Sequence, residues 1–141
     1  MPEYRARFGN AFKQVGQARR AVVDYARHWF SGQDLSDIES AVGEALANSA
    51  EHGSKSGTAV DVRARCDGDK FVVEVTDAGP GFQRWDAVDY VRPMHNASRG
   101  YGIYIMRELM DEIEYSERGT RLRLAKRLPS ARTNENGRLR A

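Results

Sequence analysis

Two polar residues on one segment could do chemistry together. Glu44 and Asn48 are four residues apart in a stretch whose apolar residues recur at helical spacing, so their side chains share one helix face. A carboxylate can take a proton from a hydroxyl group, and an amide oxygen suits a hard cation such as Mg²⁺. Alone, such a pair is most often an ordinary solvated face, so the interpretation depends on other motifs.

A second motif, Asp77-Ala78-Gly79-Pro80-Gly81, directly follows a predicted strand. The carboxylate of Asp77 could accept a hydrogen bond from a flat ligand, and Gly79 and Gly81 would let the backbone pass close to it. Read in isolation, the same five residues are more simply a tight turn.

A third motif, Arg99-Gly100-Tyr101-Gly102, precedes a helix predicted from about Ile103. Glycines at a helix N-terminus leave backbone N–H groups facing outward, which together with the helix dipole favours a phosphate group. A lone Gly-x-Gly is weak support. The segment matches neither the P-loop pattern nor the dinucleotide-binding fingerprint.

The elements that must position these motifs follow from hydrophobic periodicity. The pattern predicts two amphipathic helices, then a hairpin around Asp67-Gly68, a long loop, a third helix, and two closing strands around a turn at 117–119. A weak strand at Tyr4 to Phe8 would lie at a sheet edge. Helices followed by mostly antiparallel strands predict a two-layer α/β sandwich. The expected segments are 12–29 and 35–53 (helices), 60–66 and 71–76 (hairpin), 79–99 (loop), 103–110 (helix), 113–115 and 121–128 (strands).

Length and composition exclude several classes of protein. A chain of 141 residues fits one domain, and 22 basic against 20 acidic residues give no charge argument for nucleic-acid binding. The basic residues after Glu117, Lys126 among them, are expected on a solvated strand face and a loose tail, with a phosphate or acidic-partner surface as the alternative. One cysteine, Cys66, permits no internal disulfide and effectively excludes a zinc site. Its place in an alternating strand predicts a small core residue. No apolar run could span a bilayer, so a cytoplasmic protein is expected.

Together with Gly119-Thr120 before the last strand, the three motifs resemble in order and spacing the N, G1, G2 and G3 boxes of the GHKL ATPases. Within that superfamily the chain is most similar to bacterial anti-sigma factor serine/threonine kinases, through residues 44–53 and 100–112. The resemblance implies an α+β fold of the Bergerat type, a mixed, mostly antiparallel sheet covered on one face by three helices. It also implies a histidine kinase-like ATPase domain over residues 1–128, and residues 129–141 are expected to be a disordered tail.

The resemblance also implies a role for each motif. Asp77 would bind the adenine amino group, supported by Thr120, while Gly79 and Gly81 would admit the base. Residues 79–98 would form a lid over the nucleotide.

At the phosphates, the resemblance implies that Asn48 binds Mg²⁺ and that Gly100 and Gly102 offer backbone N–H groups. Glu44 would be the general base. Arg99 is a candidate phosphate contact, one position away from the arginine that some relatives carry.

The implied function is a Mg·ATP-dependent serine protein kinase that acts as an anti-sigma factor. Its partners would be a STAS-domain anti-anti-sigma factor and a sigma factor, with a homodimer as the assembly and no direct contact with nucleic acid or membrane. Two alternatives remain: an ATP-binding switch that sequesters a regulator without phosphorylating it, and an ATPase or histidine-kinase fragment. Three arginines on the first predicted helix are expected to be solvated, with contact to an acidic partner as the alternative; they are Arg19, Arg20 and Arg27.

Overall fold

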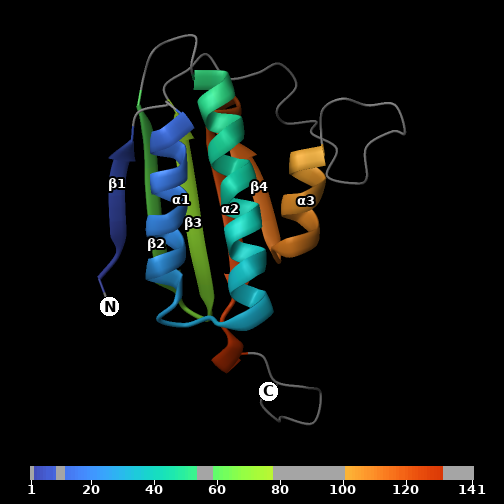
Figure 1. Cartoon of the computed structure of the whole chain (residues 1–141). Coiled ribbons are helices and arrows are strands. Elements are labelled where there is room, and N and C mark those ends of the chain that lie inside the picture. Colours follow the sequence, from blue (N-terminus) through green and yellow to red (C-terminus); the bar gives the residue numbers. More distant parts are fainter. Residues whose placement is uncertain (1, 9–11, 54–58, 78–100, 132–141) are drawn as a thin grey trace.

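In the part of the chain that the structure describes, five strands form one sheet, and three helices cover one of its faces (Figure 1). The computed structural model describes residues 2–8, 12–53, 59–77 and 101–131. The strand order is β1-β2-β3-β5-β4, and all four described pairings are antiparallel where a mixed sheet was expected. The strands are β1 (Tyr4–Phe8), β2 (Val60–Asp67), β3 (Lys70–Asp77), β4 (Glu112–Ser116) and β5 (Arg121–Arg127).

The helices follow the predicted amphipathic segments, with bounds that differ by one to three residues. They are α1 (Phe12–Ala26), α2 (Gly32–Gly53) and α3 (Tyr101–Leu109). The first predicted helix ran to Trp29, but the chain leaves the α-helix after Ala26 and continues in hydrogen-bonded turns. Gly32, at a φ of 56°, then begins α2, because a left-handed backbone is open to glycine at low cost.

The core lies between the sheet and the helices because β3 alternates its side chains between two faces. Phe71, Val73 and Val75 are fully buried in the cluster formed with the helices. Glu74 and Thr76 lie half-buried on the opposite face, which none of the described helices covers and which we call the helix-free face. Cys66, predicted as a core residue, is half-buried at the margin of this cluster.

The hairpin of β2 and β3 closes one residue later than predicted. Asp67 pairs with Lys70, so Gly68 and Asp69 form the two-residue turn, with Gly68 at a φ of 64°. A tight antiparallel hairpin needs positive φ in such a turn, and glycine adopts it without strain. At the other end of β5, a short turn of 3₁₀ helix, η4 (Pro129–Ala131), packs its last residue against the core. The domain boundary after Leu128 stays a prediction.

Lys126 is buried, which contradicts its expected place on a solvated strand face. Its side chain turns toward the helices, where Nζ donates a 2.7 Å hydrogen bond to the carbonyl oxygen of Leu109 at the end of α3. Asp37 of α2 lies 4.0 Å from the same nitrogen. One ammonium group therefore ties β5 to α3 and α2, because an unmatched buried charge would be costly.

Replacing Lys126 by methionine is expected to lower the free energy of unfolding by about 1–3 kcal/mol, since the Leu109 carbonyl loses its donor in a partly buried place. Arg127→Met is the matched control, because its ion pair with Asp69 is exposed and long. Chemical denaturation of both variants measures the difference. Equal stability of Lys126→Met and wild type would contradict the role given to the ammonium group.

Candidate functional site

The start of α3 lies directly against the polar face of α2. A Cβ atom added to Gly102 would be 2.7 Å from Oε2 of Glu44 and 3.6 Å from Nδ2 of Asn48. The contact with Glu44 is shorter than any side chain tolerates, so only glycine fits there without moving the carboxylate. The structure therefore brings together three predicted site residues from two segments that are far apart in the sequence.

Packing of α3 against the core fixes this contact, because Met106 lies four residues after Gly102 and therefore on the same face of the helix. Met106 is fully buried and Met110 almost so, and Ile103 packs against the same core. The first turn of α3 contains Gly102, and the N–H groups of a first turn have no acceptors within their own helix. The positive end of the helix dipole thus lies beside a carboxylate and an amide.

A second part of the candidate site lies where β3 ends. Asp77 is buried, and its backbone N–H donates a 2.9 Å hydrogen bond to the carbonyl oxygen of Thr120, which extends the pairing of β3 with β5 by one residue. Asp77, the predicted adenine contact, and Thr120, predicted to support it, are therefore neighbours across β3 and β5.

An unusual turn places Thr120 at this position. Glu117, Arg118 and Gly119, which form the 3₁₀ segment η3 (Glu117–Gly119), all have positive φ, at 51°, 60° and 86°. Left-handed backbone is strained for the first two residues and natural for glycine. The hydroxyl group of Thr120 donates a 2.7 Å hydrogen bond to the carbonyl oxygen of Glu117 and closes the turn.

Figure 1 shows that these parts share one end of the sandwich: the C-terminal end of α2, the end of β3 and the start of α3. Thr120 belongs to the same end because of its hydrogen bond to Asp77. The remaining predicted site residues lie outside the described residues, as does the proposed lid at 79–98; they are Gly79, Gly81, Arg99 and Gly100.

A polar helix face, a helix N-terminus with glycine, and a buried aspartate at a strand end together suit a nucleotide-binding α+β domain. The chain belongs to the histidine kinase-like ATPase domain family, whose model matches residues 8–126. Membership in this family implies that ATP is the nucleotide.

Individual relatives show which members of this family the chain is similar to. The chain is 30% identical to an anti-sigma F factor of Clostridium botulinum over 105 residues, covering 67% of this chain and 71% of that protein. It is 28% identical to the serine-protein kinase RsbW of Halalkalibacterium halodurans over 111 residues, 73% of this chain and 68% of that one. The chain is thus a distant homologue of anti-sigma F factors and RsbW serine kinases.

A solved structure shows the same fold. The crystal structure of the RsbU and RsbW domains of Rv1364c from Mycobacterium tuberculosis superposes with a TM-score of 0.67 at 19% identity, covering 91% of this chain. The chain spans 33% of that longer protein. Among the residues described here, no helix is both long and apolar enough to cross a membrane.

Two features of this structure were not predicted. The first is the buried Lys126. Strand alternation puts it on the same face as Leu122 and Leu124, but the many arginines around it favoured an exposed position. The second is a row of arginines on the helix-free face of the sheet, contributed by β1, β2 and β5. An Arg-x-Arg spacing in each of these strands is the sequence signal that could have revealed it.

Proposed function

We propose that this protein is a Mg·ATP-dependent serine protein kinase that regulates a sigma factor by phosphorylating a STAS-type anti-anti-sigma partner. The observation that carries the proposal is the convergence of Glu44 and Asn48 on Gly102 at the N-terminus of α3. A proton acceptor and a cation ligand then each lie within contact distance of Gly102, at a helix end that could bind phosphate.

The residues present fit Mg²⁺ and ATP. Magnesium prefers oxygen ligands and usually takes only one or two from the protein, the rest being water and phosphate oxygens. The amide group of Asn48 would supply such an oxygen beside the start of α3. Bound there, ATP would supply the phosphoryl group and Mg²⁺ would neutralise the negative charge of the phosphates.

The chain's own groups orient the reaction. Backbone N–H groups in the first turn of α3 bind phosphate oxygens, and the side chain of Asn48 fixes the cation position. The carboxylate of Glu44 takes the proton from the serine hydroxyl of the partner. Most of the rate enhancement in such a site comes from positioning and charge stabilisation, which a small domain can provide.

At the other part of the site, the Asp77 carboxylate accepts a hydrogen bond from the adenine amino group. Thr120 supports the same edge of the base through its hydroxyl oxygen. Gly79 and Gly81 allow the base to approach, Gly100 and Arg99 contact the phosphates, and residues 79–98 close over the nucleotide. The support for these assignments is the pairing of Asp77 with Thr120 and the resemblance of the motifs.

The proposed setting is a cytoplasmic homodimer whose competing partners are the STAS protein and the sigma factor.

Incubation of the protein with Mg·ATP and STAS proteins of the same genome, followed by mass spectrometry of the partner, tests the function. Phosphate on one serine of a STAS protein is the expected result. A protein that binds ATP and a partner without ever phosphorylating it would instead be a sequestering switch.

Asp77→Asn is expected to weaken ATP and ADP binding about 10-fold or more, because an amide replaces an acceptor-only carboxylate and leaves the adenine contact poorly matched. The matched control is Asp67→Asn at the far end of the hairpin, where the residue is exposed. Titration calorimetry with Mg²⁺ present measures both affinities. Loss of affinity in neither variant would remove Asp77 from the adenine site.

A further inference from the structure

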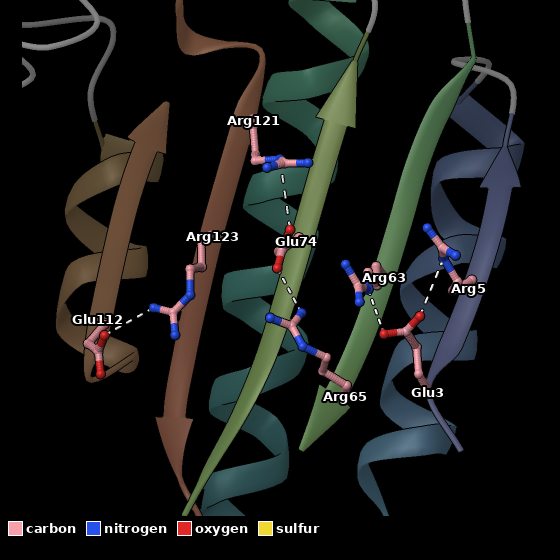
Figure 2. Close-up of polar contacts among 8 residues, drawn as sticks. All are labelled: Glu3, Arg5, Arg63, Arg65, Glu74, Glu112, Arg121 and Arg123. Carbon is pink, nitrogen blue, oxygen red and sulfur yellow. Dashed lines mark hydrogen bonds and ion pairs between the residues drawn. The ribbon is translucent and has the colours of Figure 1, made fainter. Parts of the chain in front are cut away.

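The helix-free face of the sheet carries an organised set of arginines. Each of three strands holds an Arg-x-Arg pair, and because side chains alternate along a strand, both members of a pair lie on one face. In β2 and β5 the residue between the two arginines is buried against the helices, and in β1 Tyr4 and Phe8 on either side of the pair pack against the core. The arginines therefore lie on the opposite face, and Figure 2 shows all of them except Arg7. The pairs are Arg5 and Arg7 in β1, Arg63 and Arg65 in β2, and Arg121 and Arg123 in β5.

Part of this face is hollowed. A cavity of about 390 Å³, which we call the arginine hollow, opens to solvent on the helix-free face. Four guanidinium groups line it, with two carboxylates and a threonine among them. The lining residues on this face are Arg5, Arg7, Arg63, Arg121, Asp61, Glu74 and Thr76.

The carboxylates in and around the hollow are already engaged. Asp61 accepts hydrogen bonds of 2.7 and 3.3 Å from Arg7. Glu3 accepts one of 2.5 Å from Arg63 and lies 3.4 Å from Arg5.

The third carboxylate, Glu74, accepts a 2.7 Å hydrogen bond from Arg65 and lies 3.8 Å from Arg121 (Figure 2). Burial alone would raise the pKa of Glu74, but the Arg65 hydrogen bond and the charges of Arg65, Arg121 and Arg63 outweigh it and leave the pKa lowered. Glu74 is therefore ionised at neutral pH.

Among the described residues, positive charge remains in excess in this region. Five guanidinium groups face the three carboxylates Glu3, Asp61 and Glu74. The side chains of Arg5 and Arg7 remain 72% and 73% exposed, so their outer N–H groups stay open to a further acceptor. A planar guanidinium group binds a carboxylate through two parallel hydrogen bonds.

We propose that the arginine hollow is a docking site for an acidic segment of a partner protein. An extended segment with carboxylates at alternate positions matches the spacing of Arg5 and Arg7, which is about 6.8 Å for two residues of a strand. The interleaved carboxylates disfavour the continuous phosphate backbone of a nucleic acid and favour a protein surface of mixed charge. Complementary charge of this kind speeds association and fixes orientation.

This docking site is separate from the candidate nucleotide site. Glu44, Asn48 and Gly102 belong to the helix layer, whereas the hollow opens on the other face of the sheet. The inference goes beyond the proposed kinase and does not depend on it. Loss of acidic-peptide binding and loss of nucleotide binding can therefore be observed independently.

The probe is a fluorescein-labelled peptide of about 12 residues in which glutamate alternates with serine, so that its carboxylates share one face. Fluorescence anisotropy measures its affinity at about 0.05 M and 0.15 M NaCl. The test variant is Arg5→Gln/Arg7→Gln, with Arg121→Gln as a second change on another wall of the hollow. The matched control is Arg20→Gln/Arg27→Gln, which removes the same charge from exposed positions at and just after α1.

The expected result is binding by wild type that weakens about 10-fold or more in Arg5→Gln/Arg7→Gln, weakens in Arg121→Gln, and is nearly unchanged in the control. Thermal unfolding confirms that each variant is folded, and calorimetry confirms that Arg5→Gln/Arg7→Gln retains the nucleotide affinity of wild type.

Several results would overturn the proposal. Wild type that ignores the peptide, or equal losses in the test and control variants, would leave no specific site. Displacement of the peptide by inorganic phosphate at matched ionic strength would indicate a small-anion site, and tighter binding of single-stranded DNA would indicate a nucleic-acid surface. Sedimentation that shows wild type as a dimer and Arg5→Gln/Arg7→Gln as a monomer would assign the face to a second copy of the chain.

Discussion

Replacing Glu44 by glutamine is expected to slow phosphorylation of the partner serine by roughly 10² to 10⁴, the usual contribution of a general base. Glutamine keeps the size and polarity of the side chain but cannot accept the proton of the serine hydroxyl. ATP affinity should change little, because the carboxylate acts on the acceptor and not on the nucleotide. Single-turnover phosphorylation followed by mass spectrometry measures the rate, and calorimetry measures the affinity.

Glu39→Gln is the matched control, since Glu39 lies on the same helix α2 but is exposed. It should phosphorylate the partner at the wild-type rate. Asn48→Ala should differ from both, because loss of a cation ligand reduces Mg·ATP affinity as well as the rate. A Glu44→Gln variant as fast as wild type would show that another group takes the proton.

Replacing Gly102 by alanine is expected to slow phosphorylation by about 10², because the new methyl group would lie 2.7 Å from Oε2 of Glu44 and must displace it. The stability of the fold should change little, since the atom displaced is the far end of a flexible side chain. Thermal unfolding and single-turnover rates together separate these two effects. A variant that is both slow and unfolded would leave misfolding as the cause.

A double variant makes this prediction specific to the Gly102 and Glu44 contact. If alanine acts only by displacing the carboxylate, Gly102→Ala/Glu44→Gln should be about as slow as Glu44→Gln alone, because contacting residues have non-additive effects. Gly16→Ala in α1 is the control, as its added methyl group would meet only an ordinary 3.6 Å contact with the Arg20 side chain. Fully additive losses in the double variant would mean that Gly102 acts independently of Glu44, for example on the phosphates.

Much of the fold could be predicted from local pattern. The alternation in Val60 to Cys66 and Phe71 to Thr76 marks two half-buried strands, and their pairing follows from the short turn between them. Helical spacing in 35–49 likewise marks α2, since an apolar stripe must be buried against another element. The details that failed, such as the end of α1 and the position of the hairpin turn, are shifts of one to three residues, and they depend on local hydrogen bonding that the pattern does not specify.

The candidate site was likewise predictable in part from local pattern. Local order placed Glu44 and Asn48 on one helix face and Asp77 at a strand end, because helix and strand periodicities are short-range properties. Their resemblance to the GHKL motifs indicated the family, which the match over residues 8–126 confirms. The individual roles of these residues stay predictions that the variants above test.

Long-range contacts were decided only by the tertiary structure. The approach of Gly102 to Glu44, the hydrogen bond between Asp77 and Thr120, and the burial of Lys126 join residues separated by 17 to 58 positions in the chain. The sheet also aligned arginines from three separated strands around one hollow. A sequence determines which face each side chain takes within its own element, whereas packing of the elements determines which of those faces meet.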